Sequence, residues 1–328
     1  MLFSSLVSYT YKDGVTFEII QASFFVIFIG SILILFGRGH DKNIFKREGY
    51  LIVSLGWLLM VLSGTFPYIL TQTFPDFPST FFETMSGYTA TGATVLNDIE
   101  ALPPGILFWR SMTHWIGGMG IIVLAIAILP LLGIGGMQLF SAEAPGPNGD
   151  KLHPRIADTA KRLWLIYILF TIAEALMLHI AGMSIFDSIN HAMSTMASGG
   201  FSTKNKSLAY WNHQPWIHYI IIIFMFFAGS NFVLSYFAFS GKINKVLKDN
   251  EFIAYLLLVI ICSTTVFGAI FYNVDLNNST FEHPQVWGKF ESSLRHSIFQ
   301  VIAIITTTGF VTSDYTSWTS LMTIFFFG

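Results

Sequence analysis

The hexapeptide Thr89-Ala90-Thr91-Gly92-Ala93-Thr94 has two counterparts further along the chain. They are Ala197-Ser198-Gly199-Gly200-Phe201-Ser202 and Thr306-Thr307-Thr308-Gly309-Phe310-Val311. The interval from Gly92 to Gly200 is 108 residues, and the interval from Gly200 to Gly309 is 109. Each glycine follows a short stretch of helical character that ends near hydroxyl residues, at 81–88, 188–196 and 292–305. Two nearly equal intervals that enclose the same order of segments indicate an internal duplication.

A glycine that follows hydroxyl residues suits a loop whose backbone carbonyls bind a cation. Glycine tolerates dihedral angles and close approaches that other residues avoid, so successive carbonyls can face one axis. Rings of such carbonyls can replace the water shell of a cation, and the end of a short preceding helix adds partial negative charge. For one motif alone, a turn or a helix-packing contact of small residues is the simpler explanation. Three motifs in register favour cation binding.

The composition is that of a membrane protein. Hydrophobic residues make up 53% of the 328 residues and charged residues 11%, against roughly 45–50% and 25% in soluble domains. A helix needs about 20 apolar residues to span the hydrocarbon layer, and four segments qualify: 15–37, 50–73, 161–181 and 252–273. Segments 105–139 and 216–240 are long enough but contain glycines or a proline, and 317–328 begins a further one.

The positions of lysine and arginine predict which loops face the cytoplasm, because cationic loops are retained there. Eleven of the 17 fall in three alternate loops: Arg38, Lys42, Lys46, Arg47, Lys151, Arg155, Lys161, Arg162, Lys242, Lys245 and Lys248. The opposite loops are mildly acidic, with Glu83 and Glu291 among their carboxylates. This topology requires 78–92, 186–200 and 291–309 to enter and leave the membrane on one side, as segments too short to span it do.

These features resemble the superfamily of Trk, Ktr and HKT potassium transporters. The stretch Trp109-Arg110-Ser111-Met112-Thr113-His114-Trp115-Ile116-Gly117-Gly118-Met119-Gly120 is similar to the start of the second helix of repeat one in Trk-type members. Ala142-Glu143-Ala144-Pro145-Gly146-Pro147 and Pro154-Arg155-Ile156-Ala157 are similar to their linker into repeat two. The resemblance covers essentially the whole chain. It implies an all-α transmembrane fold of helix, pore-loop, helix units around a pseudo-fourfold pore.

The same resemblance implies a division of the chain into an N-terminal helix and loop at 1–48 and pore repeats at 49–145, 146–249 and 250–328, the third incomplete. Trk-type members carry an extra helix pair before repeat one, of which only 15–37 is recognisable, whereas Ktr members lack the pair. We therefore expect a partial chain of Trk type without a fourth repeat. Phe327-Gly328 would lie at the threshold of the family's gating loop. We expect residues 1–328 by themselves to conduct no potassium.

The resemblance implies potassium uptake across a bacterial inner membrane, with potassium as the transported substrate and the only metal at the site, and without a cofactor. The filter residues would be Ala90, Thr91, Gly92, Ser198, Gly199, Gly200, Thr307, Thr308 and Gly309. In the plant branch of the family serine in the first loop goes with sodium, so Gly92 implies potassium. A homodimer of the full-length protein, contacts with membrane lipid and a cytoplasmic nucleotide-binding regulatory subunit are implied as well. Proton symport and channel-like flux both stay open.

Two charged residues in apolar surroundings have alternative interpretations. Arg110, at the mouth of a transmembrane segment, either repels cations or anchors the pore mouth, or it serves as an interfacial anchor beside aromatic residues. A carboxyl such as Glu174 within an apolar helix suggests an ion or proton path, yet it need only be protonated or paired within the bundle.

Other function classes have less support. Cys262 is the only cysteine, so an internal disulfide and a cysteine metal cluster are excluded. His114, His179, His191 and His296 lack the spacing of metal ligands, which leaves an intramembrane metal or haem enzyme as an alternative. We expect His191 and His296 to hydrogen-bond a neighbouring loop instead. A net charge of −2 argues against a nucleic-acid partner, and a non-transporting structural membrane subunit is the other alternative.

Overall fold

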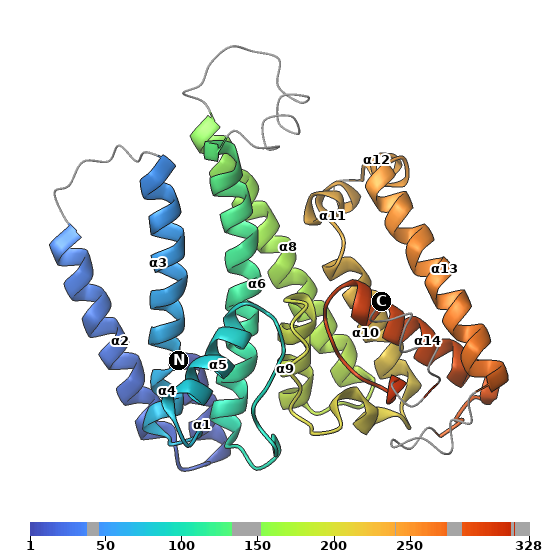
Figure 1. The fold of residues 1–328 in the computed structure, drawn as a ribbon, viewed down its shortest axis with the longest axis horizontal. Coiled ribbons are helices and arrows are strands. Elements are labelled where there is room, and N and C mark those ends of the chain that lie inside the picture. The colour runs from blue at the N-terminus through green and yellow to red at the C-terminus, as the bar shows by residue number, and fades with distance from the viewer. Residues whose placement is uncertain (38–45, 133–151, 240, 274–283, 316–317, 319–328) are drawn as a thin grey trace. The chain divides into compact units, whose positions relative to one another are not determined.

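The computed structural model describes residues 1–37, 46–132, 152–239, 241–273, 284–315 and 318. Every regular element in these ranges is helical (Figure 1). In chain order they are α1 (Leu2–Tyr11), α2 (Thr16–Gly37), α3 (Lys46–Gly64), α4 (Phe66–Leu70), α5 (Phe77–Tyr88), α6 (Pro104–Leu132), α8 (Leu152–Ile180), α9 (Ile185–Met196), η2 (Ser207–Trp211), α10 (Pro215–Ala228), α11 (Phe232–Phe239), α12 (Ile243–Leu247), α13 (Asn250–Asn273) and α14 (Lys289–Ile305). Contacts divide the chain into one unit of Met1–Thr89 and Ala93–Lys161 and a second of Ala90–Gly92 and Arg162–Gly328.

Among the described residues, four ranges are helical, long and apolar enough to cross a membrane. They are Thr16–Gly37, Leu51–Leu70, Lys161–Ile180 and Asn250–Tyr272, which confirms the four predicted spans. In the part of the chain that the structure describes, only 17% to 39% of one 18-residue window in each range is buried. Exposed apolar helices suit a bilayer, because a helix satisfies its own backbone polar groups.

In the first unit, α5 is held between α3 and α6. Tyr88, at the end of α5, lies beside Gly64 of α3 and Gly117 of α6, where a Cβ on either glycine would collide with it. The indole nitrogen of Trp109 donates a hydrogen bond to the Gly64 carbonyl at 3.1 Å. Buried apolar side chains surround these contacts, namely Ile19, Val61, Tyr68, Ile106 and Trp109. Close helix packing at two glycines thus fixes where the first short helix ends.

Helix α1 differs from the sequence prediction of a single helix ahead of the first repeat. Its buried side is polar: Ser4 and Ser8 are buried, while Leu2 and Phe3 on the other side are exposed. Ser4 donates a hydrogen bond to the carbonyl of Gly105, at the start of α6. A ten-residue helix with buried serines is shorter and more polar than a spanning segment, so a search for apolar segments misses it.

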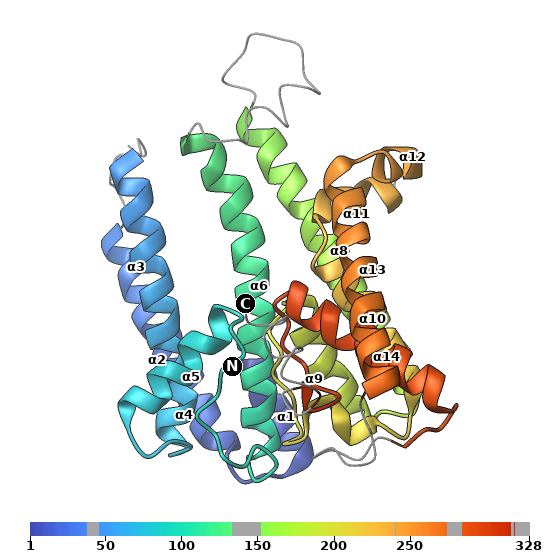
Figure 2. The ribbon, with the colours of Figure 1, turned by 45° about the vertical axis from the view of Figure 1, so that its right-hand side comes forward.

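In the second unit, α9 packs on α10, and α14 packs on both α10 and α13 (Figure 2). The predicted segment 216–240 is not one helix, because α10 ends at Ala228 and α11 begins at Phe232. Thr306, directly after α14, fills the space that a side chain at Gly229 would need. The break between α10 and α11 therefore brings the end of α14 against α10.

Some sequence expectations lie outside the described residues. These are the linker stretch 142–147, the cationic residues Arg38, Lys42 and Lys151, and the final apolar stretch apart from Trp318.

Candidate functional site: three re-entrant loops

Each candidate loop follows a short helix, α5, α9 or α14. Two of these helices have side-chain caps: Asp76 Oδ1 accepts from the Ser79 amide at 2.7 Å, and the Ser184 hydroxyl accepts from the Asp187 amide at 3.0 Å. Hydrogen bonds from the side chain and the amide of Ser79 hold the pKa of the exposed Asp76 carboxyl below its ordinary value. Peptide dipoles add along a helix, so the C-terminal end next to each loop carries partial negative charge.

The three loops share one unusual backbone pattern. In each, a residue other than glycine has a positive φ, and a glycine with positive φ follows two residues later. The angles are 52° and 76° at Ala90 and Gly92, 53° and 78° at Ser198 and Gly200, and 58° and 77° at Thr307 and Gly309. Positive φ is uncommon in residues other than glycine. Because residues with positive and negative φ alternate in these loops, successive carbonyl groups point to the same side of the chain. Each loop can therefore present a short row of carbonyl oxygens to a cation.

The loops lie against one another within the second unit, to which Ala90–Gly92 belong by their contacts. A Cβ built on Gly92 would overlap the carbonyl oxygen of Gly199, and one on Gly200 would overlap the carbonyl oxygen of Thr308. A Cβ on Gly309 would meet none of the described atoms within 4 Å. The first loop thus adjoins the second and the second adjoins the third. Both contacts depend on glycine, because any side chain there would strike backbone.

A buried carboxylate holds the segment that follows the first loop. Glu83 of α5 accepts hydrogen bonds from the Thr94 hydroxyl at 2.9 Å and from the Val95 amide at 3.0 Å. It also pairs with Arg110 Nε of α6 at 2.7 Å, with side-chain exposures of 0% for Glu83 and 2% for Arg110. The sequence places Glu83 both among the outer-loop carboxylates and in the short helical stretch 81–88, and the structure has it in α5 with its side chain buried. Arg110 is buried too, so it is not an exposed interfacial anchor. Both lie in the protein interior, because each neutralises the other's charge there.

The second short helix braces its loop at the same position. Glu83 and His191 each lie nine residues before the glycine of their loop. His191 Nε2 is 2.9 Å from the Ser202 hydroxyl, which stands two residues past the glycine, as Thr94 does in the first loop. The duplication therefore extends beyond the loops to the side chains that hold them.

A second bracing position recurs in the second and third repeats, thirteen residues before the glycine. Asp187 accepts a hydrogen bond from the Thr203 hydroxyl at 2.5 Å, and His296 Nδ1 is 2.9 Å from the Thr312 hydroxyl. The expectation that His191 and His296 hydrogen-bond to loops is confirmed.

Arg295 of α14 is a further buried charge that the sequence prediction missed. It is 0% exposed and pairs with Glu291 through Nε at 2.8 Å. Its Nη1 lies 2.6 Å from His218 Nδ1 on α10. Because an arginine can only donate, His218 accepts at Nδ1 and donates from Nε2 to the Leu208 carbonyl at 3.0 Å. The four-residue spacing of Glu291 and Arg295 on a helix was the available sequence signal.

Glu174 of α8 is 0% exposed and faces Thr195 of α9, the helix that carries His191. Among the described residues, no hydrogen bond of ordinary length reaches either of its carboxyl oxygens. The ion-path and the structural interpretation of Glu174 both stay predictions.

The chain was compared with known proteins. A family model for TrkH, described as a cation transport protein, matches residues 15–328. The Trk system potassium uptake protein TrkH of Salmonella typhimurium is 43% identical over 326 residues, covering 97% of this chain and 64% of the relative. The Trk system potassium uptake protein TrkG of Escherichia coli K12 is 38% identical over 286 residues, covering 85% and 56%.

A solved structure shows which known fold this chain resembles. The crystal structure of the potassium transporter TrkH from Vibrio parahaemolyticus superposes with a TM-score of 0.84 at 34% identity, covering 99% of this chain and 64% of that one. The chain therefore spans 64% of the length of these TrkH proteins. The predicted all-α transmembrane fold is confirmed.

Proposed function

We propose, since this chain belongs to the TrkH family of cation transport proteins, that its three re-entrant loops form part of a potassium selectivity filter. The chain is a multi-pass protein of the bacterial inner membrane. The ligands would be backbone carbonyls of the predicted filter residues, Ala90–Gly92, Ser198–Gly200 and Thr307–Gly309. The observation that carries this proposal is the shared φ pattern in loops that touch at Gly92 and Gly200.

The proposed mechanism is replacement of water by peptide oxygens. A potassium ion that enters from the outer side would shed water as carbonyls from successive loops take its place. The C-terminal ends of α5, α9 and α14 would favour a cation at the loops through their partial negative charges. Buried braces such as Glu83 and His191 would keep each loop from collapsing when no ion is bound. No covalent bond is made or broken in this process, and potassium is substrate rather than cofactor.

Several features of the whole transporter are proposals from the same family membership. We propose that the three loops belong to a pseudo-fourfold ring. We also propose the repeat boundaries given above, a homodimer for the full-length protein and a cytoplasmic nucleotide-binding regulatory subunit. The relatives' name, potassium uptake protein, supports potassium as the substrate.

Selectivity measurements on full-length protein test the filter proposal. Gly200→Ser adds a side chain at φ 78° where a Cβ overlaps the Thr308 carbonyl oxygen, so it should lower the preference for potassium over sodium while membrane insertion persists. Uptake of rubidium, with sodium and potassium as competitors, measures that preference in vesicles. Gly268→Ala is the matched control, because Gly268 lies in α13 with nothing within 4 Å of an added Cβ.

The decisive result is the ratio of ions in a variant that inserts normally. A Gly200→Ser protein with the wild-type preference for potassium over sodium would overturn the filter proposal. A preference changed equally by Gly268→Ala would show that the effect is not local to the loops.

A further inference from the structure

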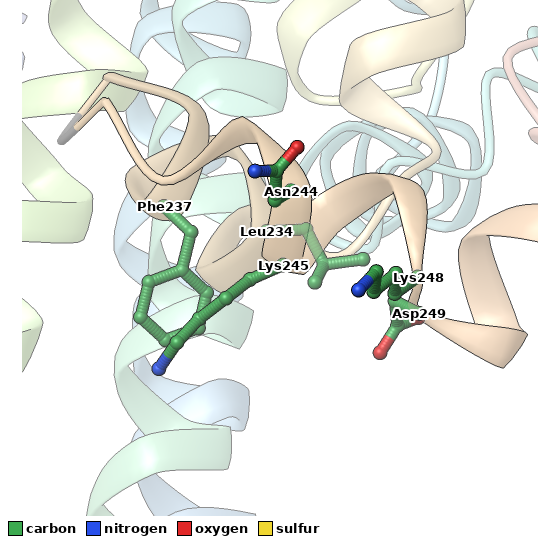
Figure 3. Close-up of a pocket in the computed structure, with 6 residues that line it drawn as sticks. All are labelled: Leu234, Phe237, Asn244, Lys245, Lys248 and Asp249. Carbon is green, nitrogen blue, oxygen red and sulfur yellow. The ribbon is translucent and has the colours of Figure 1, made fainter.

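A basic pocket lies at the junction of α11, α12 and α13, away from the three loops. It has a volume of about 510 Å³ and is lined by Leu234, Phe237, Asn244, Lys245, Lys248 and Asp249 (Figure 3). Three of these residues belong to the lysine-rich segment that the sequence assigns to the cytoplasmic side. The pocket therefore sits where α13 would enter the membrane from the cytoplasm.

The polar part of the pocket is positively charged. Lys245 and Lys248 line it, and Lys242 lies one turn earlier on the same segment. The Lys245 ammonium is 4.9 Å from the centroid of the Phe237 ring, and the Lys242 ammonium is 6.0 Å from it. The one carboxylate among the lining residues, Asp249, accepts a hydrogen bond from the Phe252 amide at 3.0 Å, at the start of α13. Two ammonium groups, those of Lys245 and Lys248, therefore outnumber the carboxylates that line the pocket and attract an anion.

The surroundings of the pocket are apolar and face outward. On α12, Ile243 and Leu247 are 56% and 59% exposed. Below them, α13 exposes Ile253 and Leu257 along the span that begins at Asn250. A row of lysines above an exposed apolar helix matches a phospholipid of the inner leaflet, whose phosphate lies at the membrane surface and whose acyl chains run beside the helix.

We propose that this pocket binds the phosphate group of an anionic phospholipid from the cytoplasmic leaflet. Lys245 and Lys248 would contact the phosphate oxygens, and Asn244 can donate to the glycerol or headgroup oxygens. Leu234 and Phe237 would meet the first carbons of the acyl chains. A free phosphate ion could use the same lysines, but it would leave the apolar wall and the exposed α13 surface without a partner. The lipid-site proposal does not depend on whether the three loops bind potassium.

Native mass spectrometry of the full-length protein tests the site. Purified, delipidated protein is titrated with dioleoylphosphatidylglycerol, which is anionic, and with dioleoylphosphatidylcholine, which has no net charge. Each lysine near an anionic surface is worth about 1 kcal/mol, so the double variant Lys245→Gln/Lys248→Gln should bind phosphatidylglycerol roughly 30-fold more weakly. The matched control is Lys206→Gln/Lys289→Gln, which removes the same charge from the opposite loops. Lys245→Arg/Lys248→Arg should restore binding.

Each outcome bears on the site. Selective binding of phosphatidylglycerol to the wild type and to the control, lost in the double variant, supports it. Equal binding of phosphatidylcholine, or undiminished binding by a folded double variant, overturns it. Displacement of the lipid by equimolar inorganic phosphate would assign the pocket to a free anion instead. Melting temperature and rubidium uptake, measured on every variant, exclude loss of fold as the cause of weaker binding.

Discussion

Neutralising either member of the buried pair Glu83–Arg110 should destabilise the protein by several kcal/mol. The pair has an N–O distance of 2.7 Å, and both side chains are almost completely buried. Removing one partner of such a pair leaves a buried charge without its counter-charge, which typically costs about 3–5 kcal/mol. An exposed ion pair would cost less than about 1 kcal/mol. Because this pair is buried, we expect the larger cost, about 3–5 kcal/mol.

The two single variants should lose different amounts of stability, because Glu83 has more hydrogen-bond partners than its pairing with Arg110 alone. In Arg110→Gln, the Glu83 carboxylate keeps its hydrogen bonds from Thr94 and Val95, so the cost should lie near 3 kcal/mol. In Glu83→Gln, the guanidinium stays buried, and the amide accepts fewer hydrogen bonds from the segment that follows the first loop. Its cost should approach about 5 kcal/mol. The double variant Glu83→Gln/Arg110→Gln buries no charge and should cost less than the sum of the single variants.

Thermal denaturation of the detergent-solubilised full-length protein, followed by fluorescence-detected size exclusion, measures these differences. Glu100→Gln, at an exposed position between α5 and α6, is the control and should change stability by less than about 0.5 kcal/mol. Single variants that cost no more than this control would refute the assignment of a buried ion pair. Strict additivity in the double variant would show that the two residues do not interact.

Three further outcomes are expected. Glu174→Leu removes a buried carboxyl that no hydrogen bond of ordinary length reaches among the described residues, so the folded protein should be unchanged or more stable by about 1–3 kcal/mol; loss of rubidium uptake without loss of stability would instead place Glu174 in the ion path. Ser202→Ala leaves His191 Nε2 without its partner at 2.9 Å and should cost about 1–3 kcal/mol in thermal denaturation, whereas an unchanged melting temperature would contradict the bracing role. The pKa of Asp76 is lowered by its hydrogen bonds with Ser79, so its contribution to stability is complete above the ordinary aspartate pKa of about 3.9 and is lost as the pH falls through the lower folded value. The melting temperature should therefore fall more steeply on acidification in the wild type than in Asp76→Asn, and parallel curves would exclude this linkage.

Hydrophobic length and the spacing of three glycines were enough to predict the spans and the positions of the three loops. Hydrophobic length decides which segments cross a bilayer, because the hydrocarbon thickness sets a fixed number of helical residues. The nearly equal spacing of Gly92, Gly200 and Gly309 located the three loops that follow α5, α9 and α14. The hydrogen bonds of His191 and His296 to loops were also predictable from their positions in short helices. These are local or periodic properties, which a one-dimensional pattern records.

Which distant residues come into contact depends on how the helices pack in three dimensions. Glu83 and Arg110 are 27 residues apart, and nothing in their local sequence distinguishes a buried pair from one exposed acid and one interfacial base. The contacts of Gly92 with Gly199 and of Gly200 with Thr308 likewise join segments about 110 residues apart in the sequence. A search for apolar segments does not find helix α1, because the buried side of this helix is made of serines. Burial and charge pairing depend on neighbours that are distant in sequence, so the sequence pattern alone does not predict them.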